Sequence, residues 1–262
     1  MRIKPKKSLG QNFLTDKNIQ RKIIAAYCLE TSDRVLEIGA GYGEITKLIA
    51  GNAGFVYAVE IDSQLCKVLR ENTNGLSNVE IINEDIMKLD FNASFKGVKN
   101  KIKVVGNIPY YITTPIIEYL FKHRQKIKTV FLMVQKEFAK RIAAVAGSKE
   151  YGSFSCFVNY YSIPKILFVV KKNSFTPAPK VDSCLLELKI RESAPVKVKD
   201  EELFFKVIRA GFNKRRKTLR NSLEGIISPD KLREFFRENN IDSNVRPERL
   251  NLIDFARLAD KA

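Results

Sequence analysis

An amide, a rigid turn and an aromatic ring follow one another within the stretch KVVGNIPYYITTPI, residues 103–116. Its apolar start predicts a short buried strand, and the strand gives way to Asn107, Ile108, Pro109 and Tyr110. The Asn107 side-chain oxygen and the Ile108 carbonyl could accept the two N–H bonds of a planar amine, while Pro109 fixes the turn. Tyr110 could then stack on the ring that carries the amine. The alternative interpretation is an ordinary turn closed by a core tyrosine.

A second candidate site begins in the stretch VLEIGAGYGEIT, which predicts a strand, a glycine-rich turn and a helix. Gly39, Gly41 and Gly43 would let the backbone approach a ligand closely. Glu60 ends the next strand, 21 residues after Gly39, where a carboxylate can accept hydrogen bonds from both hydroxyls of an adenosine ribose. Without that spacing, the glycines would form only a helix-capping turn, and Glu60 would be a solvated strand end.

Asp85 follows the third predicted strand in INEDIMKLD, where it can accept a hydrogen bond from an adenine amine or simply cap a helix. These features fit NAD as well as S-adenosylmethionine. The opening stretch favours S-adenosylmethionine. Methyl transfer to a planar amino group needs an amide and an aromatic ring at the end of the fourth strand, whereas hydride transfer needs neither.

The exocyclic amine of adenine is a poor nucleophile, because its lone pair is delocalised into the ring. Two acceptors at Asn107 and Ile108 would favour a tetrahedral nitrogen whose lone pair points at the sulfonium methyl. Stacking on an aromatic such as Tyr110 is worth about 1 to 3 kcal/mol per base. A base presented in this way must be flipped out of its helix or already unpaired.

The elements that would position these residues alternate between strand and helix. Strands are predicted at 34–39, 55–61, 79–83, 103–106 and 129–134, and helical patterns such as GEITKLIAGN and SQLCKVLRENT lie between the early ones. This alternation favours an α/β fold with a doubly wound, mainly parallel sheet, whose ligands bind at the carboxyl ends of the strands. Residues 163–170 and 184–190 predict an antiparallel pair at the sheet edge.

The pattern becomes helical after the polar stretch RESAPVKVKD. We therefore place a domain boundary near residues 190 to 200, which gives a ligand-binding domain over 1–190 and a small helical domain over 191–262. The helical domain contains five cations within seven positions of NKRRKTLRN: Lys214, Arg215, Arg216, Lys217 and Arg220. We predict that these lie on one or two turns of a helix whose inner face carries Phe204, Val207, Ile208 and Phe212, and that they bind RNA phosphates. The alternative is a solvated charged face.

The composition supports an anionic partner. The 262 residues include 46 Lys and Arg against 29 Asp and Glu, a net charge of +17, which indicates nucleic acid or an anionic membrane surface. No apolar run approaches the roughly 18 residues of a membrane span, so nucleic acid is favoured and no membrane partner is expected. The four cysteines are far apart and His123 is the only histidine, so we expect neither a metal site nor a disulfide framework. The charged start MRIKPKKSLG predicts a cytoplasmic protein.

From KSLGQNFL near its start to RPERLNLIDFARLAD near its end, the chain resembles the KsgA-type family of ribosomal RNA adenine dimethyltransferases. The resemblance implies a Rossmann-like class I methyltransferase sheet, S-adenosylmethionine as cofactor, and a helical domain that binds RNA or the ribosome. It implies that Gln11, Asn12 and Leu14 contact the cofactor, and it supports Gly39, Glu60, Asp85 and Asn107. It also implies that Phe175 in FTPAPKVDS faces Tyr110 across the target adenine, although most phenylalanines are core residues.

The resemblance further implies dimethylation of two adjacent adenosines in the 3′-terminal hairpin loop of small-subunit ribosomal RNA. The partner would be this RNA within the immature small subunit, and we expect a monomer. Ala40 and Ile108 depart from the commonest family pattern, but neither removes a proposed hydrogen bond. The alternatives are a large-subunit methyltransferase of the macrolide-resistance type, which the helical tail disfavours, and a protein that acts mainly as an assembly factor. A methyltransferase-derived transcription factor would predict an organellar targeting segment, and we identify none.

Overall fold

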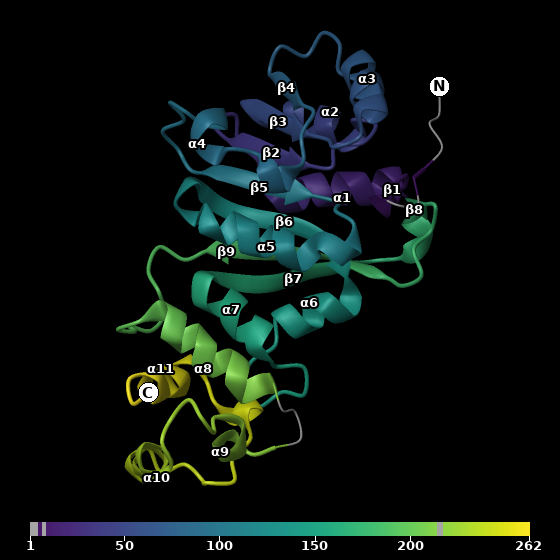
Figure 1. Cartoon of the computed structure of the whole chain (residues 1–262). Helices are drawn as coiled ribbons and strands as arrows, with labels where there is room; N and C mark the ends of the chain where they lie inside the picture. Colours follow the sequence, from purple (N-terminus) through teal and green to yellow (C-terminus); the bar gives the residue numbers. More distant parts are fainter. Residues whose placement is uncertain (1–4, 7–8, 214–216) are drawn as a thin grey trace. The chain divides into compact units, whose positions relative to one another are not determined.

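The structure is a computed structural model that describes residues 5–6, 9–213 and 217–262 (Figure 1). The chain divides into two compact units. The first extends to Ala139 and resumes over Lys165–Ile190, and the second comprises Lys140–Pro164 and Arg191–Ala262. Each unit is described by itself below.

A seven-stranded sheet organises the first unit, in the order β4-β3-β2-β5-β6-β9-β7 (Figure 1). The first five strands in this order are parallel to their neighbours, and β9 is antiparallel to β6. Their bounds are Arg34–Ile38 (β2), Phe55–Val59 (β3), Val79–Ile82 (β4), Ile102–Gly106 (β5), Ile127–Gln135 (β6), Ser162–Val170 (β7) and Ser183–Ile190 (β9). Each predicted strand therefore exists, and the order reverses direction on either side of β2. A reversal of this kind leaves a crevice between β2 and β5 at their carboxyl ends.

Two short strands, β1 (Phe13–Leu14) and β8 (Phe175–Thr176), form a separate antiparallel pair in the first unit. The α-helices of this unit are α1 (Lys17–Tyr27), α2 (Glu44–Ala50), α3 (Ser63–Asn72), α4 (Phe91–Ser94) and α5 (Thr113–Lys122). Its 3-10 turns are η2 (Ile86–Lys88), η3 (Tyr110–Ile112), η4 (Arg124–Lys126) and η5 (Lys172–Ser174). Aspartates cap the starts of three of these helices: Asp16 accepts from Asn18 N in α1, Asp62 from Gln64 N in α3, and Asp90 from Asn92 N in α4.

The core of the first unit includes a cluster between α1, α2 and one face of the sheet. Its buried members are Leu14, Ile23, Tyr27, Val35, Ile49, Ala50, Ala53, Val56, Val105, Phe131, Met133, Val170, Phe175 and Leu185. Strands β2 and β5 are buried on both faces over most of their length, which explains why they form continuous apolar runs in the sequence. One charged side chain interrupts β5: Lys103 is only 7% exposed.

Lys103 joins the sheet to the end of α1. Its Nζ lies 2.8 Å from Asp33 Oδ2 and also donates to the carbonyl oxygens of Tyr27 and Cys28, at 3.3 and 2.6 Å. Because both charged groups are buried, each depends on the other for its neutralisation.

The second unit is helical. Its elements are α7 (Ser153–Tyr161), α8 (Glu201–Asn213), α9 (Leu219–Ser222), α10 (Pro229–Glu238), η6 (Pro247–Arg249) and α11 (Leu252–Ala259), while α6 (Lys136–Ile142) and β7 cross the division. The predicted helices near the carboxyl end are confirmed, and Phe204, Val207 and Ile208 are buried as expected. Phe212 is half-buried and lies against Phe255, with 5.8 Å between ring centroids.

The structure differs from the predicted division in one respect. Residues 140–164 belong with the carboxyl-terminal helices, because α7 packs against α8 through pairs such as Tyr160 and Phe205, whose ring centroids lie 5.2 Å apart. The sequence did not indicate that α7 packs with the carboxyl-terminal helices, because α7 lies between two strands of the sheet in chain order. The end of β9 at Ile190 coincides with the predicted boundary.

For Lys217 and Arg220, the prediction that the basic residues share one helix with Phe204, Val207 and Ile208 is wrong. Helix α8 is described to Asn213, and the separate helix α9 begins at Leu219, where Thr218 accepts a hydrogen bond from Asn221 N as its cap. Lys217 and Arg220 are exposed, but they lie in a bend and in a separate short helix. Lys214, Arg215 and Arg216 lie outside the described residues.

Within the described ranges, no helix has the length and apolar character needed to cross a membrane.

We expect Asp33→Ala to lower the free energy of unfolding by about 3 to 5 kcal/mol, because the Lys103 ammonium would stay buried without its carboxylate. Glu44→Ala is the matched control: it breaks an ion pair with Lys17 whose side chains are 44% and 62% exposed, and it should cost less than about 1 kcal/mol. Urea unfolding followed by circular dichroism measures both. Equal losses in the free energy of unfolding would show that the buried Lys103–Asp33 pair contributes no more to stability than the exposed Lys17–Glu44 pair.

Candidate active site at the carboxyl ends of the parallel strands

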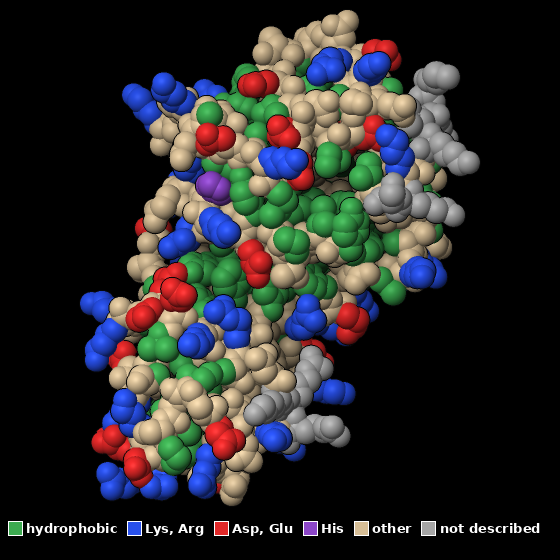
Figure 2. All heavy atoms as spheres, in the orientation of Figure 1, with side chains coloured by type: hydrophobic (Ala, Val, Ile, Leu, Met, Phe, Trp, Pro, Cys, Tyr) green, Lys and Arg blue, Asp and Glu red, His purple; other side chains and the backbone are tan. Residues whose placement is uncertain are grey.

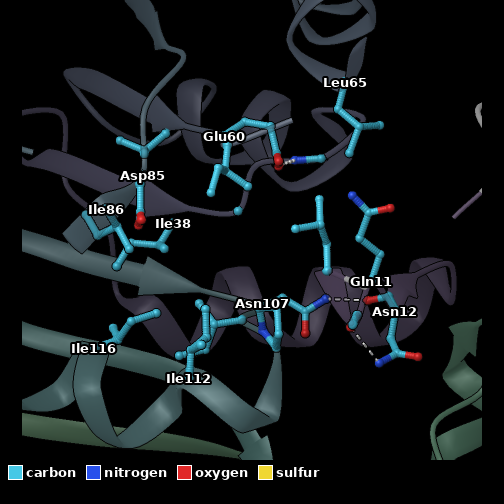
Figure 3. A pocket seen from close by; sticks show the side chains of 18 of the residues that line it. Gln11, Asn12, Ile38, Glu60, Leu65, Asp85, Ile86, Asn107, Ile112 and Ile116 are labelled. Atoms are coloured by element: carbon cyan, nitrogen blue, oxygen red, sulfur yellow. Dashed lines mark hydrogen bonds between the residues drawn. The ribbon is translucent and has the colours of Figure 1, made fainter. Parts of the chain in front are cut away.

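A cleft opens where β2, β3, β4 and β5 end, at the reversal of strand order (Figure 3). Five chain segments far apart in sequence line it: 9–13, 38–41, 59–61, 84–86 and 107–112. Ile116 of α5 and Leu65 of α3 complete its apolar walls. Most residues that the sequence singled out therefore meet in one place, namely Gln11, Asn12, Gly39, Gly41, Glu60, Asp85, Asn107, Ile108, Pro109 and Tyr110.

The glycine turn leaves backbone open to the cleft. Gly39 and Gly41 have φ angles of +74° and +59°, a conformation that strongly favours glycine. A Cβ at Gly41 would lie 3.2 Å from the Phe13 ring, so the turn also packs closely against the amino-terminal segment. Gly39 is exposed, and a ligand can lie directly against its backbone.

Glu60 is held rigidly at the end of β3 and is only 5% exposed. Its two carboxylate oxygens accept from Gly41 N and Asp62 N, each at 2.9 Å. Burial raises the pKa of Glu60, and the hydrogen bonds from the Asp62 and Gly41 amides oppose that rise. A carboxylate offers about four lone-pair sites, so both oxygens can accept a further hydrogen bond from ligand hydroxyls.

Asp62 fastens the amino-terminal segment to this site, a role that the sequence reasoning missed. Its Oδ2 lies 2.8 Å from Lys6 Nζ and 3.5 Å from Gln11 Nε2, while Gln11 Oε1 accepts from Lys6 N at 2.8 Å. Burial alone would raise the pKa of Asp62, but the hydrogen bonds from Lys6, Gln64 N and Gln11 and the Lys6 charge outweigh it and lower the pKa. The available signal was an acidic helix cap two residues after Glu60.

Asn107 ends β5 with its side-chain amide in a fixed orientation. Its Nδ2 donates to the Asn12 carbonyl at 2.9 Å, and Asn12 Nδ2 in turn donates to the Gly10 carbonyl at 3.2 Å (Figure 3). Because a carbonyl can pair only with the nitrogen end of an amide, the bond to Asn12 leaves Asn107 Oδ1 to act as an acceptor. The sequence predicted Asn12 as a cofactor contact, and the structure adds that its backbone orients Asn107.

Tyr110 begins the 3-10 turn η3 and is half-buried. Its hydroxyl lies 2.6 Å from Ser183 Oγ at the start of β9, and Ser183 is fully buried. Burial raises the pKa of Tyr110, and the hydrogen bond with Ser183 opposes the rise. The sequence indicated a role only for the ring of Tyr110. In the structure its hydroxyl also anchors the ring, through a hydrogen bond to a residue 73 positions later in the chain.

Three residues predicted to contact a ligand have other roles or positions in the structure. Asp85 lines the cleft, and its Oδ1 also caps η2 by accepting from Met87 N at 3.0 Å, which leaves Oδ2 as the atom for a ligand. Leu14 and Phe175 are opposite each other in the β1 and β8 pair, and they are 8% and 3% exposed in the buried cluster. Neither of these two lines the cleft. Their contacts with cofactor and base stay predictions.

The chain matches the family model described as ribosomal RNA adenine dimethylase over residues 2–262. The chain belongs to this family. Two curated relatives named ribosomal RNA small subunit methyltransferase A are similar to it: the protein of Streptococcus gordonii is 44% identical over 97% of this chain and 91% of its own length. That of Lachnoclostridium phytofermentans is 46% identical over 97% of this chain and 90% of its own length. The resemblance found in the sequence is confirmed.

Solved structures agree on the fold. A dimethyladenosine transferase from Plasmodium falciparum superimposes with a TM-score of 0.78 at 28% identity, over 94% of this chain and 95% of that one. The 23S rRNA methyltransferase ErmE gives a TM-score of 0.75 at 24% identity, over 95% of this chain and 99% of that one. At that identity the second likeness shows the fold alone. The first unit is therefore a Rossmann-like class I methyltransferase sheet, as predicted, and helices follow it at the carboxyl end.

We expect Glu60→Gln to weaken S-adenosylmethionine binding by about 10- to 150-fold, the range for lost charge-assisted hydrogen bonds. Glutamine has one acceptor oxygen, so its NH₂ group would face either the Gly41 or the Asp62 N–H, donor against donor. Glu84→Gln is the matched control, because Glu84 also lines the cleft but is exposed, and its affinity should change far less. Titration calorimetry measures both, and an unchanged dissociation constant for folded Glu60→Gln would remove Glu60 from the cofactor site.

Proposed function

We propose that the protein transfers methyl groups from S-adenosylmethionine to the exocyclic amine of two adjacent adenosines in the 3′-terminal hairpin loop of small-subunit ribosomal RNA. The observation that carries the proposal is the Asn107 amide, fixed by the Asn12 carbonyl with Oδ1 left as an acceptor, directly before Tyr110 in the same cleft. The small-subunit enzymes at 44% and 46% identity support this substrate over the large-subunit alternative, for which ErmE is only a distant structural neighbour.

The cleft fits S-adenosylmethionine, the methyl donor of this family. The carboxylate of Glu60, already held by two backbone amides, would accept from the ribose hydroxyls, and the exposed Gly39 backbone would lie against the cofactor. Asp85 Oδ2 would accept from the adenine amine. Gln11 and Asn12, held by Lys6 and Asn107, would close over the bound molecule. The cofactor supplies a sulfonium methyl, which is electrophilic.

The chain's own residues make the adenine amine reactive. Asn107 Oδ1 and the Ile108 carbonyl accept its two N–H bonds, which favours hydrogens out of the ring plane and so localises the lone pair on the nitrogen. As the nitrogen becomes tetrahedral and partly positive, both oxygens stabilise it more strongly than in the ground state. Tyr110, held by Ser183, supports the base from one face. Methyl transfer exchanges a sulfur–carbon bond for a nitrogen–carbon bond, and the amine then loses one proton to water.

The same proposal includes the form of the RNA substrate, the place of action and the oligomeric state. The relevant form of the RNA is the immature small subunit, so the protein would act in the cytoplasm where subunits are assembled. One chain carries the complete set of proposed site residues, which supports action as a monomer. The exposed Lys217 and Arg220, together with Lys214, Arg215 and Arg216, would bind RNA phosphates.

The test of the proposal is single-turnover methylation of small subunits that lack the modification, with labelled S-adenosylmethionine and nucleoside analysis. Asn107→Ala should lower the rate by about 100-fold or more, since an acceptor that acts in the transition state is lost. Tyr110→Ala should lower it by about 5- to 150-fold through loss of stacking. Affinity for the subunit should change less than the rate, because these contacts act most strongly in the transition state. A near-wild-type rate for Tyr110→Ala would mean that this ring does not support the base.

Ser183→Ala and Tyr110→Phe provide the matched pair for the Tyr110 anchor. Each removes the same hydrogen bond and keeps the ring, so each should lower the methylation rate by only about 2- to 10-fold. The double variant should be no slower than either single one, because the two changes remove one shared interaction. Additive losses would show that the two hydroxyls act separately.

The basic residues should act through phosphates and not through bases. Lys217→Ala combined with Arg220→Ala should lower affinity for RNA of any sequence and reduce the salt slope by about one unit per lost contact. The control is Lys99→Ala with Lys101→Ala, which removes the same charge from an exposed loop of the first unit. If both double variants bind small subunits alike, the charges at 217 and 220 act only through the net charge of the protein.

A further inference from the structure

We propose that Tyr111 is a platform on which the nucleobase next to the target adenosine stacks. This rests on the proposed function, since it adds a second base position to the same RNA substrate. Tyr111 lines the cleft and directly follows Tyr110 in the turn η3. Its side chain is nevertheless 64% exposed, so much of the ring is open to a partner.

The exposure of Tyr111 is unusual for this protein. Among the described residues, the other large hydrophobic side chains that are exposed are aliphatic or methionine, and every other phenylalanine and tyrosine is buried or half-buried. Figure 2 shows hydrophobic side chains gathered over the amino-terminal half of α5, the helix that begins one residue after η3 ends. Single exposed aliphatic residues are ordinary on a surface. An exposed aromatic ring on the rim of a ligand cleft has the shape and polarity that stack on a base.

The ring is also held in place before any ligand binds. Gly10 has a φ of +58°, and a Cβ there would lie 3.2 Å from Tyr111 Cε1 and 3.2 Å from Pro109 Cβ. The Cδ1–Cε1 edge of the Tyr111 ring therefore lies close to the amino-terminal segment, next to the rigid proline. Because its position is fixed by backbone on one side, little side-chain entropy is lost when a base stacks on the other.

Tyr110 and Tyr111 cannot serve the same base. Successive side chains of a 3-10 turn point about 120° apart, since the turn has about three residues. The contacts agree: the Tyr110 hydroxyl reaches Ser183 in β9, whereas the Tyr111 ring lies against Gly10. Moving a target base out of its stack uncovers a face of its neighbour, and that neighbour needs a new partner. Tyr110 would support the target and Tyr111 the adjoining base.

This arrangement predicts a kinetic signature that differs from that of Tyr110. A base that stacks on Tyr111 does not react, so its contact is equally strong in the ground state and the transition state. Tyr111→Ala should therefore raise KM for the small subunit by about 5- to 100-fold and leave kcat close to wild type. Tyr111→Phe should restore the wild-type KM, because the contact uses the face of the ring.

A fluorescent base reports the stacking directly. A hairpin oligonucleotide from the small-subunit RNA, with 2-aminopurine at the nucleotide adjoining the target, is titrated with wild type, Tyr111→Ala and Tyr111→Phe. We expect quenching on binding to wild type and Tyr111→Phe, and distinctly weaker quenching with Tyr111→Ala. The matched control is Leu76→Ala, which removes an exposed apolar side chain, 37% exposed, that does not line the cleft.

Two outcomes would overturn the proposal. Equal quenching by Tyr111→Ala and wild type would show that no base stacks there. If Tyr111→Ala instead weakens S-adenosylmethionine binding as much as RNA binding, the ring serves only to hold the amino-terminal segment at Gly10. Methylation of unmodified small subunits by the wild type tests the proposed function separately, so its failure is distinguishable from a failure at Tyr111.

Discussion

The hydrogen bond from Asn107 Nδ2 to the Asn12 carbonyl is the interaction on which the site depends. It joins the end of β5 to a segment 95 positions earlier in the chain, and it decides which end of the Asn107 amide can accept from a ligand. If the amide turned over, a donor would meet the donor N–H of an adenine amine, and the proposed polarisation of that amine would be lost. The sheet places Asn107 at the cleft, and the amino-terminal segment sets the orientation of its side-chain amide.

That segment is itself held from the cofactor side. Asp62 binds Lys6 and Gln11, and its own N–H donates to Glu60, so one aspartate links the proposed ribose-binding carboxylate with the amino-terminal segment at the cleft. The two carboxylates of this link, Glu60 and Asp62, are buried, where hydrogen bonds to charged groups are strong and poorly screened. Glu60, with both oxygens already engaged, is rigid before any ligand arrives. Such preorganisation lowers the reorganisation that binding and methyl transfer require.

The sequence predicted the sheet and most of the cleft because these depend on local patterns. Buried parallel strands are apolar runs; Gly39, Glu60 and Asn107 each follow one directly, and Asp85 lies three residues after another. Asp62 and Ser183 were missed because their partners lie far away in the chain, and a lone aspartate or serine carries no sign of that pairing. Helix α7 was assigned to the wrong unit for the same reason. The prediction for the basic stretch was wrong locally: the spacing of the cations did not indicate that Lys217 lies in a bend and Arg220 in the separate helix α9.

The amino-terminal segment also connects the two substrates of the proposed reaction. Gln11 and Asn12 lie on the cofactor side of the cleft, while the neighbouring Gly10 supports the ring of Tyr111 on its rim. Any ligand that fastens this segment at Gln11 therefore also steadies the surface offered to RNA. Because coupling between two binding sites is reciprocal, any free energy by which cofactor binding at Gln11 favoured stacking on Tyr111 would equal the free energy by which that stacking favoured cofactor binding. The order in which the substrates bind can then vary without loss of that coupling, since the free energy depends only on the bound states.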